Sequence, residues 1–246
     1  MSRPHHTHIA EAPKGSFGPR DRFIEQHGLP GSRKEISETS LKHKYKAIKK
    51  LDDNGALNEG IWKVQKLDGQ RAGKLCVLKK ISYSQKEGRL LLREIEILHV
   101  LKHPNIVGFI EACIPCGSEG IAELFLEYCD QGDLQRILNK YIAYNEDYKF
   151  PDHPWEWVPE GFVWHVYRSL ASALAYLHYG VYHDDIDNPP RIDTQWPYIL
   201  HRDIKPENVL LKSRPSNTDT LPQRSNYPTV VLADFVSLPF LLLIVQ

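Results

Sequence analysis

The residues with the clearest chemical potential lie in one short stretch, 200–208, which reads Leu-His-Arg-Asp-Ile-Lys-Pro-Glu-Asn. Asp203 could accept the proton of an attacking hydroxyl, Lys205 could neutralise a transferring phosphate, and Asn208 could hold a divalent cation. Apolar residues flank the stretch on both sides, as is typical of a loop between buried elements. The spacing of carboxylate, ammonium and carboxamide therefore favours phosphoryl transfer over a solvated charged loop.

This stretch resembles the catalytic loop of eukaryotic-type protein kinases, whose signature is H-R-D-L-x-x-x-N. The match is carried by five positions, with isoleucine in place of leucine: His201, Arg202, Asp203, Ile204 and Asn208. The resemblance implies catalytic roles for Asp203 and Lys205 and a magnesium-binding role for Asn208. A lysine at position 205 also favours serine/threonine over tyrosine specificity.

A second match lies in the first half of the chain. Val77-Leu78-Lys79 resembles the family's V-A-I-K, which implies that Lys79 holds the α- and β-phosphates of ATP. Glu94, on the helix expected to follow, matches the ion-pair partner of that lysine. Two alternatives stay open: Lys80 is the competing lysine in register, and Lys79 with Glu94 could be a surface pair of modest value.

Residues 124–134 resemble the hinge that joins the two lobes of a kinase. The resemblance implies that adenine bonds to backbone groups of Glu127 and Cys129. It also implies that Leu126 lines the back of the nucleotide pocket and that Asp133 reaches the ribose.

The phosphate-covering loop of the family, G-x-G-x-x-G-x-V, matches only in part. Val64 would stand at its valine, next to the nucleotide. Counting back from Val64 places Leu57, Glu59 and Trp62 where the glycines belong. Backbone amides cannot approach phosphates closely past such side chains, so we expect weakened nucleotide affinity.

The D-F-G motif is also incomplete. Asp234-Phe235 supplies its first two letters, which would make Asp234 the second magnesium ligand, but Val236 replaces the glycine. The resemblance covers residues 45–235, and an apolar tail, 238–245, follows it. We therefore expect a kinase domain truncated just after the D-F-G position, with weak or no activity.

Hydrophobic periodicity predicts the elements that would position these residues. Strands are expected at residues 45–51, 60–67, 74–83, 106–114, 121–129, 209–211 and 229–233. Helices are expected at residues 88–103, 133–144 and 159–178. Trp155, Trp157 and Trp164 are interpreted as core packing or a helix lead-in rather than a stacking platform.

The fold class expected from this order is α+β, a bilobal kinase-like fold with a β-rich small lobe and an incomplete, mainly helical large lobe. The expected organisation is a disordered leader at 1–40, the small lobe and hinge at 41–129, and a partial large lobe at 130–246 that ends in the aberrant apolar tail.

Composition limits the partners and the compartment. The 246 residues include 31 basic and 31 acidic side chains, so no overall field favours nucleic acid or an anionic membrane. Four cysteines make no disulfide framework, and Cys113-x-x-Cys116 is interpreted as free thiols rather than a redox or zinc site. The start lacks an apolar signal region, and the tail is shorter than the roughly 20 residues that span a bilayer. We expect an intracellular protein, cytoplasmic or nuclear, without a membrane partner.

Three functional interpretations follow. The first is a serine/threonine protein kinase that uses ATP and Mg²⁺ to phosphorylate protein hydroxyls; residues 127–134 and the insertion before the catalytic loop also resemble the NIMA-related kinases. The second is a non-catalytic pseudokinase that binds a nucleotide or a partner. The third is a truncated product without stable function. The substrate, the regulator and the oligomeric state are left open.

Overall fold

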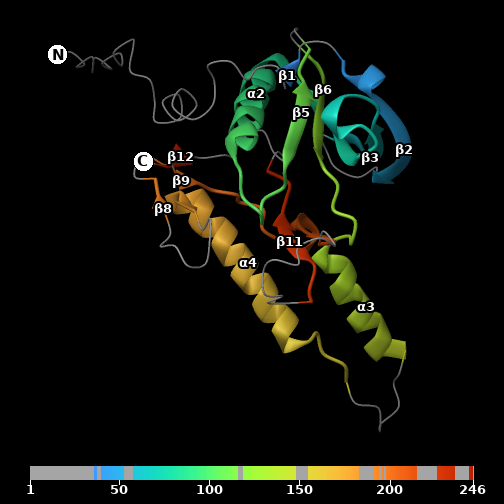
Figure 1. Ribbon diagram of the computed structural model, residues 1–246, viewed down its shortest axis with the longest axis vertical. Helices are drawn as coiled ribbons and strands as arrows, with labels where there is room; N and C mark the ends of the chain where they lie inside the picture. The colour runs from blue at the N-terminus through green and yellow to red at the C-terminus, as the bar shows by residue number, and fades with distance from the viewer. Residues whose placement is uncertain are drawn as a thin grey trace, which may run out of the picture.

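The computed structural model describes residues 36–37, 40–52, 58–115, 119–147, 155–182, 191–193, 196, 198–214, 226–235 and 244–245. A large sheet with helix α2 forms one lobe, and helices α3 and α4 with short strands form the other (Figure 1). The α+β fold expected from the sequence is confirmed. No helix of the described residues is both long enough and apolar enough to cross a lipid bilayer.

The small lobe is built on a six-stranded sheet with the order β1-β5-β6-β4-β3-β2. Its strands are β1 (Ile36–Ser37), β2 (Tyr45–Asp52), β3 (Asn58–Lys66), β4 (Leu75–Tyr83), β5 (Phe109–Cys113) and β6 (Gly120–Glu127). Neighbouring strands are antiparallel except for β1, which pairs in parallel with β5. Short 3₁₀ turns, η2 (Lys42–Lys44) and η3 (Gly69–Arg71), precede β2 and follow β3.

The two faces of this sheet have different neighbours, because side chains alternate along a strand. Ile81 of β4 belongs to the hydrophobic cluster that includes α2. Leu78 belongs to a second cluster with Tyr45, Val64 and Phe125 on the opposite, outer face. Lys79 shares the parity of Ile81 and therefore lies on the α2 side of the sheet.

Helix α2 (Gln85–Val100) covers that inner face. It begins after Ser84, whose backbone N–H and hydroxyl both donate to the Glu87 carboxylate and so stabilise the first turn. Ile95 and Leu98 are buried at helical spacing against the sheet.

Among the described residues, the second lobe contains two helices and three small strand pairs. Its elements are α3 (Leu134–Asp147), α4 (Glu160–Tyr179), β7 (Val181–Tyr182), β8 (Arg191–Ile192), β9 (Tyr198–Ile199), η4 (Pro206–Asn208), β10 (Val209–Lys212), β11 (Thr229–Leu232) and β12 (Ile244–Val245). Helix α4 ends at Gly180, whose φ of 61° is left-handed. A Cβ there would lie 2.7 Å from the Trp196 ring, so glycine is required on both counts.

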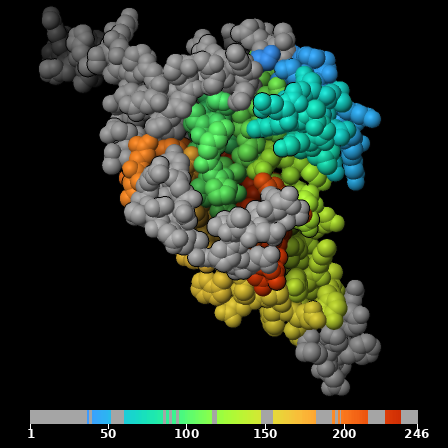
Figure 2. Space-filling model, in the orientation of Figure 1, coloured from blue at the N-terminus to red at the C-terminus, as the bar shows by residue number. Residues whose placement is uncertain are grey.

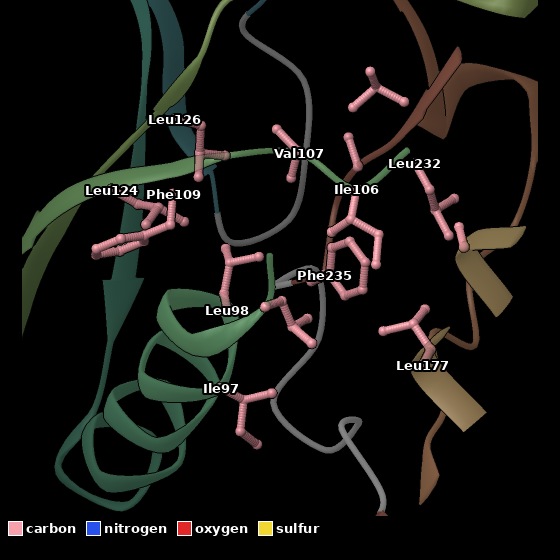
Figure 3. Packing of buried hydrophobic residues seen from close by; sticks show 14 of the residues in the cluster. Ile97, Leu98, Ile106, Val107, Phe109, Leu124, Leu126, Leu177, Leu232 and Phe235 are labelled. Atoms are coloured by element: carbon pink, nitrogen blue, oxygen red, sulfur yellow. The ribbon is translucent and has the colours of Figure 1, made fainter. Parts of the chain in front are cut away.

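One hydrophobic core runs through both lobes. Figure 3 shows Ile106, Val107 and Phe235 between Leu98 of α2 and Leu232 of β11. The backbone is joined at the same place: the Val107 N–H donates to the Leu232 carbonyl, and the Leu232 N–H donates to Asn105, each at 2.9 Å. The connection between α2 and β5 is therefore hydrogen-bonded directly to β11.

The expected strands and helices are present within a few residues of their predicted bounds, but the two-residue strands β1, β7, β8, β9 and β12 were not expected. Strand β1 falls in the predicted leader 1–40, most of which lies outside the described residues. Val236 and most of the predicted apolar tail also lie outside them, although Ile244–Val245 pairs with β9.

Core packing is the wrong interpretation of the three tryptophans. Trp155, Trp157 and Trp164 are 65%, 78% and 56% exposed. Trp155 and Trp157 precede α4 as its lead-in and stack on each other, with ring centroids 6.2 Å apart. Trp164 is two residues from the buried Phe162, which places it about 200° around the helix, on the outward side.

A buried carboxylate joins β5 to the first strands of the small lobe. The Glu111 side chain is 7% exposed; it accepts hydrogen bonds from the Tyr45 hydroxyl and Lys66 Nζ and lies 3.4 Å from Lys44 Nζ. Burial alone would raise the pKa of Glu111, but the hydrogen bonds from Lys66 and Tyr45 lower it below its ordinary value. The ionised form is thus the one that stabilises the fold.

We therefore predict that Glu111→Gln lowers the free energy of unfolding by about 2 kcal/mol at neutral pH, measured by urea denaturation. Because the folded pKa is depressed, this contribution exists above the unfolded pKa of about 4.3 and disappears as the pH falls through the folded value. The difference in free energy of unfolding between the unaltered chain and Glu111→Gln should accordingly become smaller in acid. Glu119→Gln, at an exposed position, is the control. A difference in unfolding free energy that does not change with pH would contradict the ionised state assigned to Glu111.

Candidate active site

The stretch 200–208 folds into a loop that brings its three predicted residues together. It runs from β9 to the 3₁₀ turn η4, which leads into β10. The carboxylate of Asp203 accepts a hydrogen bond from Asn208 Nδ2 at 2.9 Å and forms an ion pair with Lys205 Nζ at 2.9 Å. Asn208 Nδ2 also donates to the Asp203 backbone carbonyl at 2.8 Å. The carboxylate is thus oriented from two sides before any substrate arrives.

The pKa values of this pair follow from their contact. The hydrogen bond from Lys205, and next that from Asn208, hold the pKa of Asp203 below its ordinary value against a small effect of burial. In return, the hydrogen bond to Asp203 raises the pKa of Lys205, and the charge of Asp234 raises it further. At neutral pH the pair is therefore a carboxylate and an ammonium.

Asp234 meets Lys79 across the two lobes. Lys79 Nζ lies 2.5 Å from Asp234 Oδ1, although the residues are 155 positions apart in sequence. Asp234 follows β11 with a φ of 65°, a left-handed conformation that is rare outside glycine and turns the chain sharply after the strand. The predicted phosphate lysine and the predicted second magnesium ligand are thus in direct contact.

His201 connects the catalytic loop to the segment that carries Asp234. Its two ring nitrogens contact backbone groups on both sides, a structural role that the motif alone did not indicate. It is 6% exposed, and its Nε2 lies 2.7 Å from the carbonyl oxygen of Ala233. A carbonyl only accepts, so Nε2 carries the proton, and Nδ1 can accept from the Asp203 N–H at 3.3 Å. Burial lowers the pKa of His201, which favours this neutral form. The ring also packs edge-on against Phe235.

The oxygen donors of this site suit magnesium. Asn208 uses its amide nitrogen as a donor to Asp203, which leaves Oδ1 as the atom for a cation. Among the described residues, no group of three or more His, Cys, Asp or Glu side chains could hold a metal by itself. Magnesium does not need such a cage, because it is bound through one or two protein oxygens, water and substrate phosphates. Asn208 and Asp234 therefore fit the ion in combination with a nucleotide.

The predicted hinge residues lie at the end of β6 and in the segment after it. Leu126 pairs with Val77 of β4 and shares its inward direction. The Glu127 carboxylate accepts from the Gly108 N–H at 2.9 Å and from Lys212 Nζ at 2.5 Å, which holds the segment to both lobes. Burial, and to a lesser extent the charge of Glu127, raises the pKa of Cys129 to about 12, so the thiol stays protonated.

Asp133 has a local structural contact at the start of α3. Its Oδ1 accepts a hydrogen bond from the Arg136 N–H at 2.7 Å, the contact of a helix N-cap. The reach to a ribose that the sequence implied stays a prediction.

Val64 does not lie where the sequence analysis expected it. It is 1% exposed and packs with Tyr45 and Phe125 on the outer face of the sheet, away from Lys79. Its neighbour Lys63 pairs with Val77 and lies on the Lys79 side of the sheet instead, with Nζ 4.4 Å from the centroid of the Tyr128 ring. Motif counting missed Lys63 because it took the valine itself as the anchor, whereas the unbroken pairing of residues 60–65 with residues 75–80 places Val64 opposite Cys76 on the outer face. Strand alternation from Lys79 is the signal that would have found it.

Two other predictions fall partly beyond the description. Glu94 lies on α2, but its side chain is not among the described residues, as is also true of Leu57 and of the side chain of Glu59. Trp62, the third glycine position, pairs with Leu78 and faces outward. The structure joins Lys79 with Asp234 and Asp203 with Asn208 as two contacting pairs, and the charge of Asp234 acts on Lys205 beside Asp203.

Comparison with known proteins agrees with this arrangement. The family model described as a protein kinase domain matches residues 60–189. The chain is 33% identical to the G2-specific protein kinase nim-1 of Neurospora crassa over 180 residues, which are 68% of this chain and 19% of that protein. It is 30% identical to the G2-specific protein kinase nimA of Emericella nidulans over 183 residues, 69% of this chain and 24% of the relative. It is 28% identical to the human serine/threonine-protein kinase Nek2 over 182 residues, 72% of this chain and 36% of the relative.

These alignments confirm the resemblance to the NIMA-related kinases, and they span about a fifth to a third of the relatives' length.

The contact between Lys79 and Asp234 should stabilise the closed arrangement of the lobes. We predict a coupling free energy of about 1–3 kcal/mol in a double-mutant cycle of Lys79→Met and Asp234→Asn, measured by urea denaturation. The pair of Lys42 and Glu123 is the control: its lysine is 67% exposed and the two charges are 3.7 Å apart, so it should couple by less than about 1 kcal/mol. Equal coupling in the two cycles would show that the inter-lobe pair has no special role.

Proposed function

The chain belongs to the protein kinase domain family, and from that premise we propose that it transfers the γ-phosphoryl group of ATP to serine or threonine hydroxyls of a protein. The observation that carries the proposal is the meeting of Lys79 and Asp234 from one side with Asp203, Lys205 and Asn208 from the other. These are the side chains that such a reaction uses for positioning and charge compensation.

In the proposed mechanism, the carboxylate of Asp203 orients the substrate hydroxyl and accepts its proton. Lys205, which already contacts that carboxylate at 2.9 Å, compensates the negative charge of the transferring group. Lys79 holds the α- and β-phosphates. Asn208 and Asp234 would hold magnesium, which when bound supplies neutralisation of charge on the β- and γ-phosphates.

The adenine is proposed to lie against the hinge. It would bond to backbone groups of Glu127 and Cys129, with Leu126 behind it, Asp133 near the ribose, and Glu94 aiming Lys79. Lys63 replaces the expected apolar contact of Val64 above this place. Adenine bound there would remove water from the Lys63 ammonium group without offering it a charge in return, which costs free energy. Lys63 is therefore a reason to expect weak nucleotide binding.

A second candidate is a non-catalytic nucleotide-binding domain. Two observations favour it: Lys63 faces the cleft, and Lys79 and Asp234 neutralise each other directly. A nucleotide with its cation would have to separate that pair. Measurements of binding and of transfer on the same preparation distinguish the two candidates.

We predict that Asp203→Asn lowers phosphoryl transfer to a protein acceptor by about 10²–10⁴-fold, because it removes the proton acceptor. Binding of ATP in the presence of magnesium should change less than about twofold. Transfer from radiolabelled ATP to myelin basic protein or casein, together with calorimetric titration of ATP, measures both.

The exposed Asp68→Asn is the matched control for that experiment. A variant at position 203 that is as active as the unaltered chain would reject the proposed base. Nucleotide binding without transfer in the unaltered chain would select the non-catalytic candidate.

A further prediction concerns Lys63. Replacing it with valine should tighten ATP binding about fivefold, corresponding to about 1 kcal/mol, because an apolar side chain then faces the adenine. Calorimetric titration measures the change, and the exposed Lys74→Val is the control. Weaker binding would place Lys63 against the phosphates instead of the base.

A further inference from the structure

A hollow lies on the outer face of the small-lobe sheet, on the side away from Lys79. It has a volume of about 270 Å³ and an apolar floor formed by Tyr45, Val64, Leu78 and Phe125. The rings of Tyr45 and Phe125 stack with centroids 4.0 Å apart, and none of the four floor residues is more than 8% exposed. The floor is therefore rigid and already formed. Figure 2 shows the region of β2 and β3, in blue and cyan, at the surface on the right of the view.

The wall of the hollow contains a buried donor that lacks an acceptor. Trp62 lines the hollow, and its Nε1 is buried without a hydrogen-bond partner among the described residues. Such groups are rare in folded proteins, since each one loses its water without replacement. A ligand oxygen could satisfy it only if the Trp62 ring turned toward the hollow.

The rim is positively charged. Lys42 and Lys80 line the hollow, and the ammonium groups of Lys50 and Lys80 lie 5.4 and 5.6 Å from the centroid of the Trp62 ring. Glu123, which pairs with Lys80 across β4 and β6, lies 3.7 Å from Lys42. Its carboxylate is 5% exposed and already accepts from the Ser40 hydroxyl and the Leu41 N–H, so little of it is open to a ligand.

The dimensions favour a side chain over a whole metabolite. Pockets for drug-sized molecules measure roughly 300–1,000 Å³, so a hollow of about 270 Å³ is below that range and is comparable to one large side chain. Peptide-binding surfaces commonly combine such an anchor pocket with charged residues around it.

We propose that this hollow binds an acidic segment of a partner protein, with one aromatic side chain on the floor and flanking carboxylates at Lys42 and Lys80. The site is separated from the candidate active site by the thickness of the sheet, and it does not depend on the proposed transfer reaction.

The test uses the whole chain and a fluorescein-labelled peptide, Gly-Glu-Asp-Phe-Glu-Asp-Gly, followed by fluorescence anisotropy. We expect saturable binding to one site that weakens as salt is added, because salt screens the rim charges. A peptide with alanine for phenylalanine, and one with Gln and Asn for the acids, should each bind at least about tenfold more weakly. Absence of saturable binding, or equal binding of the alanine peptide, overturns the proposal.

Two variants of the chain locate the site, each with a matched control. Ala47→Trp fills the hollow and Lys80→Glu reverses the rim, and each should weaken the peptide at least about tenfold. Ala143→Trp and Lys140→Glu make the same changes at exposed positions of α3 and should have no effect. Circular dichroism melts establish that each variant is folded. Loss of binding in the controls as well overturns the assignment.

Two further outcomes also count against the proposal. Competition between the peptide and ATP with magnesium would place the peptide in the cleft. Concentration-dependent dimerisation in sedimentation velocity that Ala47→Trp abolishes would assign the hollow to a second copy of the chain. Unchanged ATP binding in Ala47→Trp is the result expected if the two faces act separately.

Discussion

The hydrogen bonds between the α2–β5 connection and β11 determine how the two lobes meet. Asn105 Nδ2 donates to the Val230 carbonyl at 2.7 Å, and the backbones of Asn105 and Val107 bond to Leu232. Because β11 ends two residues before Asp234, this seam sets the position of that carboxylate relative to Lys79. Ile106 and Val107 are each 2% exposed, so the seam is covered by the common core and excluded from water. A shift of β11 by one residue would break the seam and separate the two charges.

Charge compensation is what allows the candidate site to exist in a partly buried place. Lys79 is 6% exposed and Asn208 is 7% exposed, and such polar groups are costly unless they are bonded. The pairing of Lys79 with Asp234 and of Lys205 with Asp203 balances two ammonium groups against two carboxylates. The same balance means that a phosphate must compete with Asp234 for Lys79. The ion pair therefore fixes Lys79 in place and would also have to open for a phosphate to reach it.

The sheet presents different chemistry on its two faces, and neighbouring residues of one strand lie on opposite faces. On β4, Lys79 faces the cleft and Lys80 faces the outer hollow; on β3, Lys63 faces the cleft and Val64 the outer cluster. The faces are linked only through the backbone of the strands. A substitution on the outer face can thus alter a docking surface without touching the groups of the cleft, and the two proposed functions can change independently.

The sequence by itself determined the order and type of the elements, because alternation, helical period and proline positions are local properties. It also determined the contacts of Asp203 with Lys205 and Asn208, since groups two and five residues apart in one loop have few ways to avoid each other. Tertiary structure alone decided the contact of Lys79 with Asp234, which depends on the seam at β11, and the outward direction of Trp164, which depends on which side of α4 the core occupies. It also decided the place of Val64, because the pairing of β3 with β4 puts Val64 opposite Cys76 on the outer face and Lys63 opposite Val77 on the Lys79 side, and a valine at the motif spacing does not reveal that register.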